Sequence, residues 1–201
     1  MSRRVGALAL LLVTGLAPVL AAQDGTSLAG RGQRTGLTIE GVDQRLTNRF
    51  PSSVAVRLDE VIDSAEAEGL PTEPLILRAL EGGAKGIPAD RVHAAITRLH
   101  AALRRARAAL GGETSASDLA TAAAALQTGL EPTRLLELRT LRGTRSLTLP
   151  LGAYLDLVAR GAVSERAWAK VVDLARRQAA DREYDRIDPA SLVARQPEDR
   201  R

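Results

Sequence analysis

Histidine is the residue type best suited to act as a general base or a metal ligand, and this chain of 201 residues has two, His93 and His100. They lie seven residues apart in a segment with helical periodicity, so they share one face but stand ~10 Å apart along the axis. A histidine pair that chelates one metal ion from a helix is spaced by four residues instead. Because both flank an apolar stripe, we interpret them as solvated or partly buried side chains, and we expect no metal and no cofactor.

Carboxylates are the other residues that could do chemistry, as an acid–base pair acting on a glycan. The candidates are Glu73, Glu81 and Glu137, and each occurs where a helix cap or a solvated helix face already explains an acid. Four further acids near the C-terminus lack the spacing of a calcium-binding loop: Asp181, Glu183, Asp185 and Asp188.

Other catalytic signatures are missing from the sequence. The absence of cysteine excludes disulfides, thiolate metal sites and a cysteine nucleophile. The motifs of serine hydrolases, zinc proteases, P-loop NTPases and dinucleotide-binding proteins do not occur either. We therefore expect a protein without a catalytic site, with a hydrolase that uses helix-borne carboxylates as the alternative.

The densest positive spot comprises Arg104, Arg105 and Arg107, near the end of an expected helix. Cations are favoured at that end of a helix in any case, but these three are also candidate contacts for an anionic partner, such as lipid head groups or an acidic protein surface. Nucleic acid is not expected, because single strands need stacking aromatic side chains nearby. The net charge of +4 is spread among interspersed acids rather than concentrated on one face.

The first residues have the pattern of an export signal over 1–22. Two arginines precede an apolar run over 5–20, which is shorter than the ~20 residues of a membrane-spanning helix. Small residues then predict cleavage after Ala21, with Ala22 as the alternative. We therefore expect an exported protein, either periplasmic or secreted.

Composition divides the rest of the chain into three parts. Residues 23–53 are polar and rich in glycine, which predicts a flexible linker. Helical periodicity then extends over a domain at 54–187, and residues 188–201 are expected to form a disordered tail.

Inside the domain, one short phrase recurs between the helical segments: a glycine, an apolar residue, a proline or serine, and an acid. The hinge glycines of the four copies are Gly69, Gly86, Gly129 and Gly161. Glycine adopts the left-handed conformation that ends a helix, the apolar residue packs back on that helix, and proline or serine begins the next one. This pattern predicts αα-hairpins.

The fold class expected from these hinges is all-α. The glycine spacings of 17, 43 and 32 residues are uneven, which favours an irregular array over a regular solenoid. We expect about seven short helices, in an array that is repeat-like but not strictly periodic. They cover 54–68, 73–82, 88–110, 118–128, 132–142, 151–160 and 164–187.

The helix expected over 88–110 carries the clearest stripe of apolar residues. Between Val92 and Leu110 they step by four and three residues, as in an a/d seam. Such a seam can form a homodimeric coiled coil through 92–110. We favour the alternative, the central helix of a bundle, because the shorter amphipathic helices nearby need a surface to pack on.

The segment "GLPTEPLILRALEGGAKGIPADRVHAAI" at 69–96 contains the hinge motif G-[LI]-P-x-[DE] twice. It resembles a group of exported, uncharacterised all-α bacterial proteins. The resemblance implies export and a helical architecture, and it supplies no catalytic residues.

The function expected from these observations is that of an exported helical interaction or scaffold module of the cell envelope, with a protein partner. A cell-envelope hydrolase acting on peptidoglycan or peptide is the first alternative. A peripheral membrane-binding protein is the second.

Overall fold

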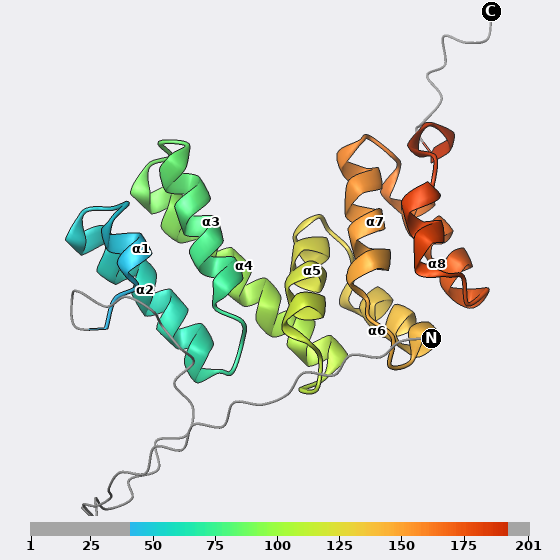
Figure 1. Ribbon diagram of the computed structural model, residues 1–201, viewed down its shortest axis with the longest axis horizontal. Coiled ribbons are helices and arrows are strands. Elements are labelled where there is room, and N and C mark those ends of the chain that lie inside the picture. Colours follow the sequence, from blue (N-terminus) through green and yellow to red (C-terminus); the bar gives the residue numbers. More distant parts are fainter. Residues whose placement is uncertain (1–40, 193–201) are drawn as a thin grey trace, which may run out of the picture. The chain divides into compact units, whose positions relative to one another are not determined.

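The computed structural model describes residues 41–192, which form helices joined by short turns (Figure 1). Seven α-helices have eleven or more residues: α2 (Ser52–Ala67), α3 (Glu73–Ala84), α4 (Ala89–Leu110), α5 (Ala116–Gln127), α6 (Pro132–Arg142), α7 (Thr148–Ala159) and α8 (Ser164–Arg176). A short helix, α1 (Gln44–Thr47), precedes them, and two 3-10 helices, η1 (Asp181–Arg186) and η2 (Pro189–Leu192), follow. No β-strand occurs among residues 41–192. The prediction of an all-α fold with about seven helices is confirmed, while its repeat-like character stays a prediction.

Each helix packs mainly on helices that are one or two elements away in the sequence. The long helix α4 contacts α2, α3, α5 and α6, and farther along α7 packs on both α5 and α8. None of the helices within the described part of the chain has both the length and the apolar content needed to cross a bilayer.

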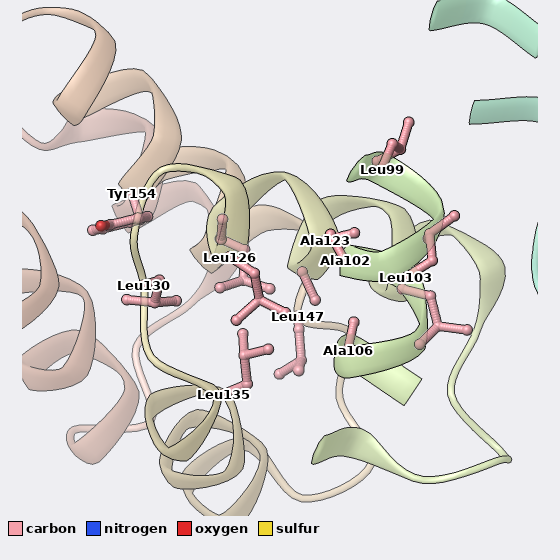
Figure 2. Close-up of a cluster of buried hydrophobic side chains, with 14 of the residues drawn as sticks. Leu99, Ala102, Leu103, Ala106, Ala123, Leu126, Leu130, Leu135, Leu147 and Tyr154 are labelled. Atoms are coloured by element: carbon pink, nitrogen blue, oxygen red, sulfur yellow. The ribbon is translucent and has the colours of Figure 1, made fainter. Parts of the chain in front are cut away.

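The core is built from the apolar stripe of α4 and the small residues that face it. Leu99, Leu103 and Ala106 are buried beside the alanine-rich α5, in a cluster that includes Leu135 of α6 and Leu147 (Figure 2). The apolar stripe is therefore covered by helices of the same chain. A homodimer through 92–110 would require those helices to separate from α4, and it stays a prediction.

Five helix ends share one backbone geometry. The residue after the helix has a positive φ at Gly69, Gly86, Gly129, Gly161 and Gln178. The N–H of the next residue then donates to the carbonyl five residues earlier, at 2.8–3.1 Å in all five turns. This is the Schellman motif, which satisfies carbonyls that the helix leaves free.

The N-terminal boundary of the helical domain differs from the prediction. Residues 41–53 were assigned to a linker, but Val42 and Leu46 are buried and Phe50 packs against the core. These residues are spaced by four, so they form one helical face that is too short to stand out from its polar surroundings. The predicted signal peptide at 1–22 and the rest of the linker at 23–40 lie outside the described residues.

The C-terminal boundaries differ as well. A helix was expected over 164–187, but α8 ends at Arg176 because Gln178 adopts φ +55°, and η1 follows. The predicted tail at 188–201 begins with η2, and the Leu192 carbonyl accepts a hydrogen bond from the Val163 N–H at 3.2 Å. Residues 193–201 lie outside the described part.

Candidate functional site

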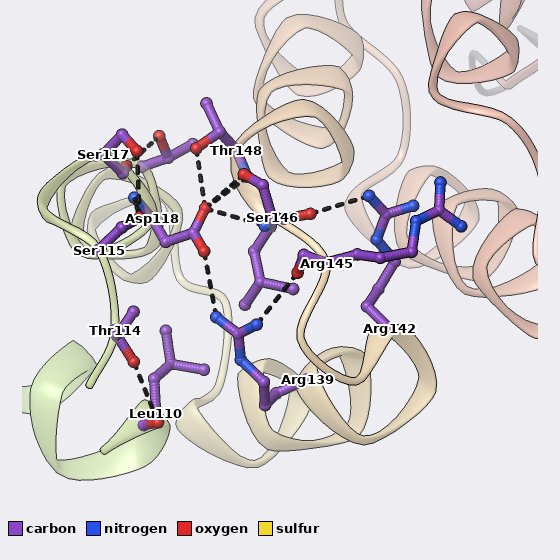
Figure 3. Close-up of polar contacts among 12 residues, drawn as sticks. Leu110, Thr114, Ser115, Ser117, Asp118, Arg139, Arg142, Arg145, Ser146 and Thr148 are labelled. Atoms are coloured by element: carbon purple, nitrogen blue, oxygen red, sulfur yellow. Dashed lines mark hydrogen bonds and ion pairs between the residues drawn. The ribbon is translucent and has the colours of Figure 1, made fainter. Parts of the chain in front are cut away.

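Two deeply buried charged residues, Asp118 and Arg142, flank the turn at 143–147 between α6 and α7 (Figure 3). Each is 4% exposed. Buried charges are expensive unless they are paired, so this cluster is the first place to look for chemistry.

The Asp118 carboxylate is used to hold this turn. Its Oδ1 accepts hydrogen bonds from the Ser146 hydroxyl at 2.7 Å and from the Leu147 N–H at 2.8 Å. The same oxygen accepts from both the N–H and the hydroxyl of Thr148, at 2.9 and 2.8 Å. Oδ2 pairs with Arg139 Nη2 at 3.1 Å. Since α7 has no side-chain cap of its own, Asp118 caps it from the first turn of α5.

These contacts also set the charge state of Asp118. Burial raises the pKa of its carboxyl, but hydrogen bonds from Ser146, Thr148 and Arg139 outweigh burial and lower the pKa below its usual range. A general acid needs the opposite shift, and a general base needs a free lone pair. The carboxylate therefore has the properties of a structural cap rather than of a catalytic group.

Arg142 extends the cluster to η1. Its Nη2 donates to the Ser146 carbonyl at 2.8 Å and to Asp181 Oδ1 at 2.9 Å. Arg145 reaches the same Asp181 oxygen at 2.9 Å, and the Arg142 guanidinium lies 5.4 Å from the centre of the Tyr184 ring. The Arg142 hydrogen bond lowers the pKa of Asp181, and burial raises the pKa of Tyr184. The cluster joins α5, α6, α7 and η1, and each of its acids is held by arginine.

The carboxylates proposed from the sequence are paired as well. Glu73 forms a two-point pair with Arg45, at 2.8 and 2.9 Å, and Glu137 accepts from Arg176 at 3.1 Å. The pairing of Arg45 with Glu73, and next with Asp43, raises the pKa of the arginine. Within residues 41–192, no three histidine or acidic side chains gather closely enough to hold a metal ion.

The three arginines of α4 proposed from the sequence differ in their contacts. Arg104 Nε pairs with Glu68 at 3.0 Å, and Arg107 Nη2 donates to the Gly69 carbonyl at 2.6 Å, so both hold the end of α2. Arg105 is exposed and makes no ion pair with the described residues. His100 Nε2 lies 3.4 Å from the same Glu68 carboxylate. A partner-binding role for these arginines stays a prediction.

A different kind of site lies between α3 and α4. A groove of about 130 Å³ has an apolar floor formed by Gly82, Ile87, Val92 and Ala95. A Cβ on Gly82 would lie 2.7 Å from Val92 Cγ2, so the glycine allows α3 to approach α4 closely at this point. We call this feature the α3–α4 groove.

The rim of the α3–α4 groove is charged. Glu81 pairs with Arg78 at 3.1 Å and with Lys85, and the hydrogen bond from Lys85 lowers the pKa of Glu81. Arg91 forms no ion pair with the described residues. Three cations against one carboxylate make the rim positive, although it surrounds an apolar floor.

Ile87 distinguishes this groove from the other turns of its kind. The equivalent residue after the left-handed position is buried in the other four turns: Leu70 is 6% exposed, Leu130 4%, Ala162 7% and Ala179 6%. Ile87 is 40% exposed. The sequence predicted that Ile87 packs back on the helix it follows, like the others, and this exposure was missed.

Two other features were beyond the sequence. Asp118 was missed because its partners lie 28 to 30 residues farther along the chain. Asp59 is also buried, at 4% exposure, and its Oδ1 accepts a hydrogen bond from the Asp43 N–H at 3.4 Å. Comparisons of the chain with protein-family models, with curated proteins and with solved structures find no match.

Proposed function

We propose that this protein is an exported helical interaction module that binds a protein partner and has no catalytic site. The observation that carries the proposal is the exposure of Ile87 in the α3–α4 groove. Four turns with the same backbone bury the equivalent residue, so the turn geometry itself does not require exposure. An apolar side chain left in a groove at such a position is typical of a surface that a partner covers.

The chemistry of the groove indicates the kind of partner. A cavity of ~150 Å³ accommodates a benzene-sized group, so the groove of about 130 Å³ fits one aliphatic side chain. The positive rim favours acidic residues on either side of that side chain. We therefore propose an acidic segment of a protein that inserts one aliphatic residue beside Ile87.

The proposed location of this interaction is the periplasm or the external medium. The leader pattern at 1–22 is consistent with a periplasmic or secreted module. N-terminal sequencing of the protein from an exporting cell tests this step. A mature chain that begins at Ala22 or Gln23 is expected, whereas an intact N-terminus on cytoplasmic protein would contradict it.

The pairing of the candidate acids gives no support to a hydrolase. Glu73, Glu81 and Glu137 each bind a cation, and they lie on α3 and α6 rather than in one cleft. A general acid–base pair requires two carboxyls that face one substrate.

Photo-crosslinking from the groove tests the proposal. A photoreactive amino acid at position 91, in the exporting cell, is expected to give one discrete protein adduct. The change Ile87→Ser should abolish that adduct, because it removes the apolar contact without disturbing a packed core. The matched control is Leu136→Ser on α6, where the leucine is 55% exposed but lies outside the groove. Equal loss of the adduct in both variants, or no adduct at all, would contradict the proposal.

A further inference from the structure

A second cavity lies between α8 and η1, at the other end of the helical region from the α3–α4 groove in the sequence. It has a volume of about 340 Å³ and is lined by Lys170, Leu174, Arg177, Arg182, Glu183, Arg186 and Ile187. Lys170 and Leu174 of α8 and the C-cap residue Arg177 are spaced by four and three positions, so they lie on one side of the helix. We call it the α8–η1 pocket.

The α8–η1 pocket is strongly cationic. Four of its lining residues are basic and one is acidic. The acid, Glu183, accepts a hydrogen bond from the Ala180 N–H at 3.2 Å, and Arg177 pairs with Asp173 at 2.9 Å. The other three cations, Lys170, Arg182 and Arg186, form no ion pair with any residue that the structure describes.

Most arginines elsewhere in the described part contact an acid or a backbone carbonyl, and Arg91 and Arg105, which form no ion pair there, do not line one common pocket. Arg45, Arg134 and Arg142 each pair with an acid across elements. Three unpaired cations around one cavity repel each other, and that repulsion falls when an anion enters. The binding of an anion in the pocket is therefore favoured, because it reduces the repulsion among these three cations.

We propose that the α8–η1 pocket binds the phosphate group of a phosphate ester. Several cations suit an anion that carries more than one charge or several acceptor oxygens, and the guanidinium fork matches phosphate oxygens at two points. A simple carboxylate offers one charge and engages fewer of these side chains. The volume leaves room for a small organic group beside the phosphate, in contact with Leu174 and Ile187.

Nucleic acid is a poorer ligand for this pocket, because its lining contains no aromatic side chain on which a base could stack. The phosphate could belong to a soluble ester or to a lipid head group, and the two sources present the same chemistry to the pocket. The α8–η1 pocket and the α3–α4 groove share no lining residue. The inference therefore goes beyond the proposed protein-binding function and can fail or hold separately from it.

Calorimetry on the mature protein tests the soluble source, with glycerol phosphate as the probe and acetate as the singly charged comparison. We expect glycerol phosphate to bind and acetate to bind at least tenfold more weakly. Sedimentation with mixed phosphatidylcholine–phosphatidylglycerol vesicles tests the lipid source, with phosphatidylcholine vesicles as the control. Binding in either arm should weaken as salt rises, because the contacts are ionic.

Variants test whether the phosphate ester binds in the α8–η1 pocket. The triple change Lys170→Gln, Arg182→Gln and Arg186→Gln should reduce affinity by a hundredfold or more. The matched control is Arg98→Gln, which removes an exposed arginine of α4 that forms no ion pair with the described residues, and it should leave affinity unchanged. If circular dichroism finds the triple variant unfolded, Arg182→Gln alone should still weaken binding about tenfold. Binding to neither probe, or an equal loss in Arg98→Gln, overturns the proposal.

Discussion

The turns after α2 and α3 have closely similar sequences and the same hydrogen-bonding pattern, but their surroundings differ. In the first, Leu70 is buried, and Arg107 reaches from α4 to donate to the Gly69 carbonyl. In the second, Ile87 is 40% exposed, and no side chain from another described element hydrogen-bonds to the backbone of 85–87. Local residues thus determine the shape of a turn, whereas the next helix in space determines whether the turn is covered.

The turn between α6 and α7 is held by several side-chain hydrogen bonds. Asp118 and Arg142 satisfy its N–H, hydroxyl and carbonyl groups from two other elements. A turn closed in this way contributes to stability and leaves few groups for a ligand. The α3–α4 turn keeps the Ile87 side chain exposed beside Arg91, which forms no ion pair with the described residues, and this is why we propose binding there.

The largest effect is expected from opening the closed turn. Asp118→Ala removes the cap of α7, leaves the Leu147 N–H without its acceptor, and leaves the Thr148 N–H only the Ser146 hydroxyl at 3.1 Å. We expect a loss of about 3 kcal/mol in the free energy of unfolding, measured by urea denaturation. The control is Asp90→Asn, an exposed first-turn acid paired with Arg57, which should leave stability almost unchanged. A loss no larger than that of the control would show that Asp118 does not hold the turn.

The next effect separates the two similar turns directly. Leu70→Ala empties a buried site and should cost ~2–3 kcal/mol. Ile87→Ala should cost less than ~1 kcal/mol, because much of that side chain already contacts water. Thermal or urea unfolding of the pair measures the difference. Equal losses would mean that Ile87 is covered in solution and that the groove is closed.

How far the sequence could predict these features follows from the range of each interaction. The helix ends at Gly69, Gly86, Gly129 and Gly161 depend on a left-handed residue and a backbone bond that spans five positions, so the local pattern indicates them. The apolar stripe of α4 could also be predicted from local sequence, because its periodicity indicates which residues are buried. The periodicity does not indicate which helix covers them.

The buried turn and the two proposed binding sites depend on residues far apart in the chain. The role of Asp118 requires the fold to bring residues 146–148 to the start of α5. The exposure of Ile87 depends on which element covers its turn, and no spacing of residues encodes that. The sequence did not predict that Lys170 lines one pocket with Arg182 and Arg186, because a single helix was expected over 164–187. In the structure the chain turns at Gln178.

A smaller effect should appear when the pH is lowered. Hydrogen bonds and Arg139 keep the pKa of Asp118 below its value of ~3.9 in an unfolded chain. As the pH falls, Asp118 is protonated in the unfolded chain before it is protonated in the folded protein. The stabilisation from its ionised carboxylate is therefore complete above the unfolded-chain pKa and is lost as the pH falls through the native pKa. The gap in unfolding free energy between the native protein and Asp118→Asn should therefore narrow from pH 7 to pH 3. A gap that stays constant over this range would mean that the charge of Asp118 does not matter.

The smallest effect concerns the one such turn without glycine. Gln178 holds φ +55°, a conformation that costs most residues ~1 kcal/mol and costs glycine almost nothing. Gln178→Gly removes that strain, but it also loses the 3.2 Å hydrogen bond from the Gln178 side chain to the Leu141 carbonyl and makes the unfolded chain more flexible. These terms nearly cancel, so we expect a change within ~0.5 kcal/mol.

The reverse change, Gly161→Gln, has no such bond to gain and should destabilise by about 1 kcal/mol, because it places a side chain at φ +88°. If Gln178→Gly instead proves strongly destabilising, the bond to α6, rather than the turn geometry, holds the end of α8 in place.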